Sequence, residues 1–201
     1  GAWNSFSKLL ALSQVTTGNP DLVQALVEAA QGFLALDDAS SAVACLENAR
    51  FLSPRADLQL LSDLARAHQK AGSSENALQI VETALNQNPE VPDLYLSKAD
   101  LLLDLQRPQA ALACLEHALM SYPDQPEFHC RAAHILRAEG DLPAALAHAQ
   151  QWISLVAPGS SPAYQARLTA AEIARGLLDP EQASKLLTEG GLDTALPRHP
   201  E

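Results

Sequence analysis

The octapeptide Ala-Val-Ala-Cys-Leu-Glu-Asn-Ala at residues 42–49 recurs as Ala-Leu-Ala-Cys-Leu-Glu-His-Ala at residues 111–118. Related segments begin at Ala77 and Ala145, so that the four first alanines are 35, 34 and 34 residues apart. Prolines keep the same spacing along the chain, at Pro20, Pro54, Pro89, Pro123 and Pro158. A fixed period of this length is the signature of a repeat protein, in which each period is one supersecondary unit.

Each period has the pattern of two helices joined by a turn. In the second period, Leu58, Leu61 and Leu64 recur at helical spacing, and the break Gly-Ser-Ser follows at residues 72–74. The second helix of a period starts after an Asp or Ser that can cap free amides, often with a proline in its first turn. The repeat prolines then end it, because proline cannot continue a helix. One period therefore predicts one helix-turn-helix hairpin.

Small residues occupy equivalent positions in both helices of each period. A larger side chain at a close helix crossing would overpack the site, at a cost of about 1–3 kcal/mol. We therefore expect these alanines to be buried where the helices of a hairpin cross. They are Ala30, Ala65, Ala99 and Ala133 in the first helices, and Ala42, Ala77, Ala111 and Ala145 in the second.

Taken together, the period and its recurring small and bulky positions resemble the tetratricopeptide repeat (TPR) family, whose consensus spans 34 residues. The second period carries the pattern at Leu61, Leu64, Ala65, His68, Ala77, Val81, Ala84 and Pro89, and the third at Tyr95, Ala99, Leu102, Ala111, Leu115, Ala118 and Pro123. The resemblance implies an all-α, right-handed superhelical solenoid of tandem helix-turn-helix hairpins.

Four such repeats are expected over residues 20–158. Residues 159–189 resemble a degenerate fifth hairpin, and residues 3–19 an additional N-terminal helix that is either a cap or half of a repeat. The tail, residues 190–201, is rich in Gly and Pro and is expected to be flexible.

Composition and charge narrow the classes of partner. The chain has 13 Lys and Arg against 24 Asp and Glu, a net charge of −11, and its few cations are scattered. Such a chain repels phosphate, so nucleic acid and anionic membrane surfaces are disfavoured. It also lacks an apolar run of the length that spans a bilayer, so no direct membrane insertion is expected.

The chain contains three cysteines, and no two of them have the CxxC spacing. This pattern predicts neither a disulfide framework nor a zinc site. Cys45 and Cys114 stand at equivalent repeat positions and are interpreted as packing residues. This usage favours a reducing compartment and a cytoplasmic location. A periplasmic or envelope location is the alternative if the sequence is part of a larger chain.

Motifs of catalysis are missing from the sequence, which has no HExxH, GxSxG or Gly-rich phosphate loop. Cys130 and His134 share a helix face and could be two ligands of a soft metal, but no third ligand is evident. His117, His129 and His148 are assigned to different faces or helices. We therefore expect no enzyme, no cofactor, no small-molecule substrate and no metal site.

What the resemblance implies is partner binding in a concave groove lined by the first helices. The groove-facing positions match Gln24, Gln31, Gln59, Ser62, Arg66, Gln69, Asp93, Asp100, Glu127, Cys130, His134 and Arg137, together with the apolar Val27, Leu96 and Leu103. TPR cochaperones that bind acidic C-terminal tails use a clamp of Lys, Asn and Arg. The matching positions here are Val27, Gln31, Arg66, Leu96 and Asp100, so the clamp is absent.

The function that the sequence favours is a protein interaction scaffold that holds a peptide or helix of a partner protein in this groove. The alternative is a structural spacer or assembly domain of a larger multidomain or cell-envelope protein. The chain begins at Gly1 without Met and has an extra helix at residues 3–16, and both features favour this alternative. Neither reading determines the oligomeric state or names the partner.

Overall fold

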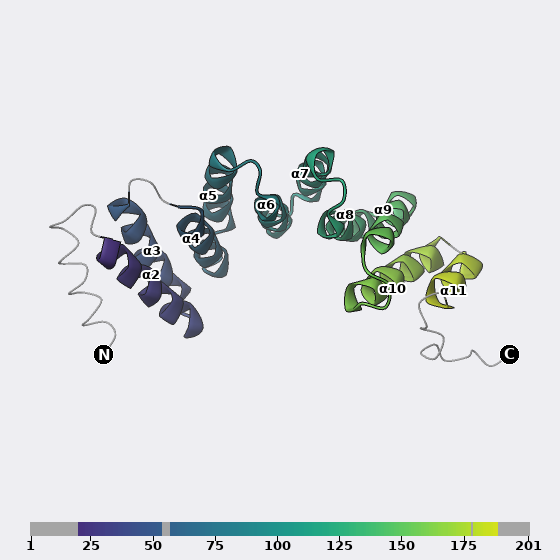
Figure 1. The fold of residues 1–201 in the computed structure, drawn as a ribbon, viewed down its shortest axis with the longest axis horizontal. Helices are drawn as coiled ribbons and strands as arrows, with labels where there is room; N and C mark the ends of the chain where they lie inside the picture. Colours follow the sequence, from purple (N-terminus) through teal and green to yellow (C-terminus); the bar gives the residue numbers. More distant parts are fainter. Residues whose placement is uncertain (1–19, 54–56, 178, 189–201) are drawn as a thin grey trace. The chain divides into compact units, whose positions relative to one another are not determined.

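The computed structural model describes residues 20–53, 57–177 and 179–188. Within these residues the chain is all-α, as predicted, and consecutive helices form antiparallel hairpins inside each of two compact units (Figure 1). The helices are α2 (Pro20–Ala35), α3 (Ala39–Leu52), α4 (Leu58–Lys70), α5 (Ser74–Gln87), α6 (Pro92–Asp104), α7 (Pro108–Ser121), α8 (Pro126–Glu139), α9 (Leu142–Leu155), α10 (Ser161–Gly176) and α11 (Pro180–Thr188). The N-terminal helix and the flexible tail predicted from the sequence lie outside the described residues.

The even-numbered helices are the first helices of their hairpins, and the odd-numbered helices are the second. α10 and α11 occupy the segment for which we predict the degenerate fifth hairpin. Pro89, Pro123 and Pro158 follow the ends of α5, α7 and α9, whereas Pro20 is the first residue of α2. No described helix combines the length and the apolar character that a membrane crossing needs.

Side-chain caps set the beginnings of several helices. Asp38 accepts a hydrogen bond from the Ser41 amide at 3.0 Å, and Asp57 accepts one from the Leu60 amide at 2.8 Å. Asp141 and Ser160 cap α9 and α10 in the same way. These bonds satisfy amides that have no partner inside the helix, and the predicted capping of second helices is confirmed for the Asp residues before α3, α9 and α11. It is wrong for Ser73 before α5, whose side chain makes no cap bond.

Residues with a left-handed backbone follow the first helices α2, α4, α6 and α8. Gly72 has φ 74° and Gly140 has φ 87°, which glycine adopts without a steric penalty. Asp37 (φ 61°) and Gln106 (φ 58°) stand at the equivalent places after α2 and α6. All four residues lie in the turn that follows a first helix, and they are 34 or 35 residues apart along the chain. The same backbone geometry is therefore repeated with different residue types.

The chain divides into two compact units, residues 1–106 and 107–201. We call them the N-terminal unit, which contains α2–α6, and the C-terminal unit, which contains α7–α11. Leu26, Leu46 and Leu64 are fully buried in the N-terminal unit, and Phe128 and Ile173 in the C-terminal unit. Each unit therefore has an apolar core of its own.

Alanines make the close helix crossings of both units possible. All eight alanines predicted at the crossings are buried, the most exposed being Ala65 at 5%. Cys45 is fully buried as well, and burial raises the pKa of its thiol to about 11, which fits a packing role. Trp152 replaces the small residue found at Ala49, Ala84 and Ala118, and it is still buried in the C-terminal unit.

Candidate partner-binding face and histidine pair

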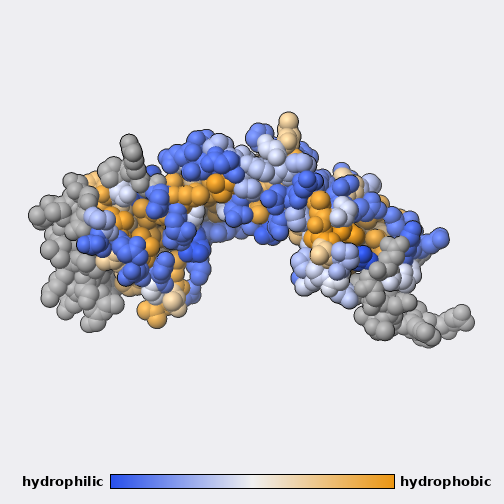
Figure 2. All heavy atoms as spheres, in the orientation of Figure 1, coloured by the Kyte–Doolittle hydropathy of each residue, from blue (hydrophilic) through white to orange (hydrophobic). Residues whose placement is uncertain are grey.

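In the N-terminal unit, the predicted partner-binding residues lie on the first helices α2, α4 and α6. Six of them are exposed and two, Ser62 and Asp100, are half-buried. We call this set the N-terminal first-helix face, which consists of Gln24, Gln31, Gln59, Ser62, Arg66, Gln69, Asp93 and Asp100. Hydrophilic residues cover much of the surface over α4 and α5 that is visible in Figure 2.

Two consecutive first helices of this unit are joined by a polar bond. The Gln69 amide donates to Asp104 Oδ2 at 2.7 Å, which connects the end of α4 to the end of α6. Lys98 on α6 forms an ion pair with Glu82 on α5 at 2.9 Å. Gln69 is thus engaged within the protein, whereas Gln59 and Asp93 are exposed at the beginnings of α4 and α6.

Arg66 has a role inside the fold that the sequence did not reveal. Its guanidinium pairs at 2.5 Å with Oδ1 of Asp63, whose side chain is only 3% exposed. None of the described residues donates a hydrogen bond to the second carboxylate oxygen, Oδ2. A buried charge is costly unless it is paired, so Arg66 compensates Asp63 besides contributing to the N-terminal first-helix face. The i, i+3 spacing of Asp63 and Arg66 is the signal in the sequence that could have indicated this ion pair.

In the C-terminal unit, the predicted residues Glu127, Cys130, His134 and Arg137 lie on α8. Glu127 and Arg137 are exposed, and Cys130 and His134 are half-buried. Arg137 Nη1 pairs with Glu172 Oε2 on α10 at 2.6 Å. This ion pair joins two first helices at residues 35 positions apart, as the bond between Gln69 and Asp104 does in the other unit.

Cys130 and His134 lie in an environment that keeps both groups neutral. Burial raises the pKa of the Cys130 thiol. Burial also lowers the pKa of His134, and the neighbouring charges of Arg137 and Arg131 lower it further. The His134 ring contacts Trp152 edge-on, with ring centroids 6.3 Å apart. His134 is therefore half-buried against Trp152, and its surroundings favour the neutral ring.

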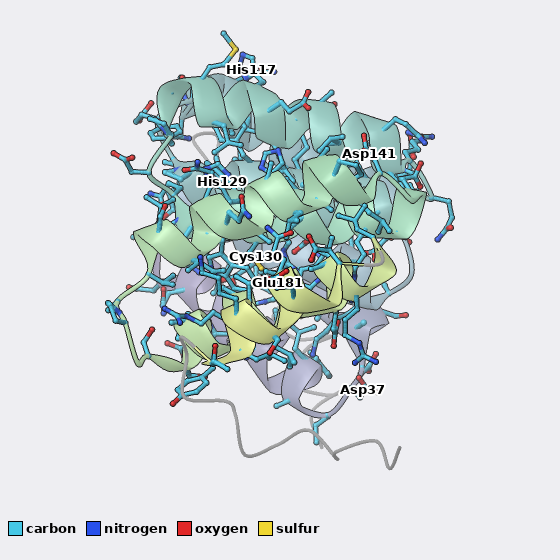
Figure 3. All side chains as sticks on the ribbon, turned by 90° about the vertical axis from the view of Figure 1, so that its right-hand side faces the viewer. Asp37, His117, His129, Cys130, Asp141 and Glu181 are labelled. Carbon is cyan, nitrogen blue, oxygen red and sulfur yellow. The ribbon has the colours of Figure 1, made fainter. Side chains whose placement is uncertain are left out.

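Two histidines meet across a pair of neighbouring helices. His129 lies on α8 and His148 on α9, different helices as expected from the sequence, and their Nδ1 atoms are 3.0 Å apart. The ring of His117 is drawn at the outer edge of α7, apart from His129 (Figure 3). Spacing along one helix shows only the face of that helix, and the contact here depends on how α8 packs against α9. Over the described residues, no group of three or more His, Cys, Asp or Glu side chains converges on one point.

A polar pocket of about 330 Å³ lies in the N-terminal unit among α3, α4 and α5. His68 forms one wall and contacts Glu47 Oε1 at 3.3 Å. None of the predicted partner-binding residues lines this pocket, so it is separate from the N-terminal first-helix face. Its lining residues are Glu47, Arg50, His68, Asn76, Gln79, Ile80 and Thr83.

The comparisons with known proteins agree on the type of fold. Residues 68–133 match the family model of the tetratricopeptide repeat. MamA (residues 41 to the end) from Desulfovibrio magneticus RS-1 is similar in structure with a TM-score of 0.69 at 16% identity, covering 89% of this chain and 97% of that one. A search of the curated proteins found no match.

Two further solved structures are similar. YrrB, a TPR protein with an unusual peptide-binding site, has a TM-score of 0.61 at 21% identity and covers 87% of this chain and 86% of its own. TTC0263, a TPR protein from Thermus thermophilus, has a TM-score of 0.59 at 20% identity and covers 86% of this chain and 91% of its own. The predicted resemblance to TPR proteins is confirmed, and the chain has the TPR fold.

Proposed function

We propose that this chain is a protein interaction scaffold and that the N-terminal first-helix face binds an extended or helical segment of a partner protein. The observation that carries the proposal is the exposure of polar side chains on consecutive first helices, with Gln59 on α4 and Asp93 on α6. Because α4 and α6 both pack against α5, with buried alanines on all three helices, the face is held in place before a partner arrives. A pre-organised surface lowers the ordering cost of binding.

Charge and fold support the same proposal. Glutamines, serine, one cation and two carboxylates make a mixed surface that can accept and donate hydrogen bonds along a peptide backbone. The fold is shared with YrrB, whose own binding site takes a peptide. The residue set differs from a carboxylate clamp, so the partner segment is expected to be recognised away from a free C-terminus.

A charge-changing double variant tests the face. We expect Gln59→Lys combined with Asp93→Lys to reduce capture of partner proteins from lysate of the source cell at least tenfold, because both exposed positions would then carry a cation. The matched control is Gln87→Lys with Glu90→Lys, which makes the same change in net charge at exposed positions at and beyond the end of α5. Captured proteins are quantified by mass spectrometry.

Circular dichroism of both variants must show the wild-type helix content and melting temperature. Equal capture by the wild type and by the Gln59 and Asp93 variant would contradict the assigned face. Selective loss of capture in an Arg50→Ala variant would move the site to the pocket among α3, α4 and α5.

A further inference from the structure

The histidine pair joins the two helices of one hairpin in the C-terminal unit. The rings of His129 and His148 face each other with centroids 5.3 Å apart and planes inclined by 42°. Both residues are half-buried, so part of the surface of each is accessible to water. The two Nδ1 atoms, 3.0 Å apart, are the closest polar atoms that the structure gives between these rings.

Backbone contact fixes the tautomer of His129. Its Nε2 lies 3.2 Å from the carbonyl oxygen of Pro123. A carbonyl only accepts, so Nε2 carries the proton and donates it, and in the neutral ring the lone pair is then on Nδ1. Metal-binding histidines in proteins are oriented in this way, with one ring nitrogen donating to a carbonyl and the other facing the ion.

We propose that the histidine pair is a binding site for a divalent transition-metal ion that prefers imidazole ligands, such as Zn²⁺, coordinated by Nδ1 of both His129 and His148. In a tetrahedral zinc site with Zn–N bonds of about 2.0–2.1 Å, two ligand nitrogens lie about 3.3–3.4 Å apart. The observed separation of 3.0 Å therefore needs to widen by only a few tenths of an ångström. Water completes the coordination, since only two protein ligands converge.

The protons of the two rings can be arranged for metal binding without a change in the charge of either ring. Without metal, His148 donates its Nδ1 proton to the lone pair of His129; with metal bound, that proton is carried on Nε2 of His148 instead. The ring stays neutral throughout, and no charged group is created. Glu116 lies close enough to act on His148 electrostatically and would offset part of the charge of the ion.

Zinc titration of the whole chain by isothermal calorimetry tests the site. We expect one Zn²⁺ per chain, and at least a tenfold weaker affinity for both His129→Gln and His148→Gln, because one imidazole ligand is lost in each. Glutamine retains a polar side chain of similar size. The matched control, His117→Gln, removes an exposed histidine of α7 in the same unit and should bind Zn²⁺ as the wild type does.

Two further measurements show whether zinc binds at His129 and His148 and whether the variants stay folded. Nitrogen-15 spectra of the histidine rings should shift at Nδ1 of both residues on addition of Zn²⁺, and circular dichroism should show that the variants keep their helices. Absence of zinc binding by the wild type would overturn the proposal and leave the pair as a hydrogen bond between rings. Binding that persists in both glutamine variants and is lost in Cys130→Ser with His134→Gln would overturn it in favour of α8 alone.

Discussion

Asp63 constrains which single residues of the N-terminal first-helix face can be exchanged without harm. Its carboxylate is buried in α4, and Arg66, with 58% of its side chain exposed, is the partner that compensates the charge. Arg66 is thus both a residue assigned to the N-terminal first-helix face and a structural partner of Asp63. Loss of binding after replacement of Arg66 would mix two effects, so Arg66 is a poor probe of partner recognition.

The prediction at this scale concerns stability. We expect Arg66→Ala to lower the free energy of unfolding by about 1–3 kcal/mol, because it leaves a buried carboxylate without its partner. Gln59→Ala, an exposed change on the same helix, should stay within about 0.5 kcal/mol of the wild type. Urea denaturation followed by circular dichroism measures both. Adding Asp63→Ala to Arg66→Ala should recover part of the loss, and an unchanged Arg66→Ala protein would contradict the role assigned to this pair.

At the scale of elements, the turns after the first helices are built on one backbone conformation with unequal residues. Gly72 and Gly140 suit a positive φ, whereas Asp37 and Gln106 adopt it with a side chain. A left-handed conformation costs an ordinary residue about 1–2 kcal/mol. The turns after α2 and α6 therefore carry strain that those after α4 and α8 lack.

Exchanging the residue types tests this strain. Gln106→Gly should raise the free energy of unfolding by about 0.5–1 kcal/mol, after allowing for the entropy that glycine loses on folding. Gly140→Ala should lower it by about 1 kcal/mol. A Cβ at residue 140 would have no atom within 4 Å, so this effect is conformational and not a clash. Denaturant midpoints measure both changes, and a less stable Gln106→Gly protein would refute the explanation.

The single helices and hairpins were the features that could best be predicted from the sequence. The periods of apolar residues, the capping Asp residues and the small residues at crossings act within one helix or one hairpin, so they could be predicted. The burial of Asp63, the contact of His129 with His148 and the pocket beside His68 depend on the angle at which neighbouring helices pack. That angle is set by many side chains together, and no spacing in the sequence records it. The residues assigned to the partner-binding face remain a prediction.

At the scale of the whole molecule, two units with separate cores make up the described chain. In repeat proteins each unit is stabilised by its own packing and by its neighbours, so stability need not be uniform along the chain. Trp152 is buried in the C-terminal unit and reports on that unit alone. The chain contains one other tryptophan, Trp3.

Spectroscopy of a single-tryptophan protein tests whether the units unfold together. In a Trp3→Phe variant, fluorescence follows Trp152, whereas far-ultraviolet circular dichroism follows the helices of both units. We expect the two urea transitions to differ in midpoint, because each unit has an apolar core of its own. Coincident curves would instead be the mark of a single cooperative unit. Superimposable curves at several temperatures would show that the chain unfolds as one body.

The side-chain bonds between first helices have a consequence for modular design. Gln69 with Asp104 and Arg137 with Glu172 each join residues 35 positions apart, one bond in each unit. The corresponding positions between these two bonds are Leu103 and Ala138, whose side chains have no polar group to share. Transplanting a single period would separate the two halves of a bond and leave an unmatched amide or charge. Each of these two bonds is therefore kept only when its two periods are exchanged together, as a segment twice as long as the repeat that the sequence displays.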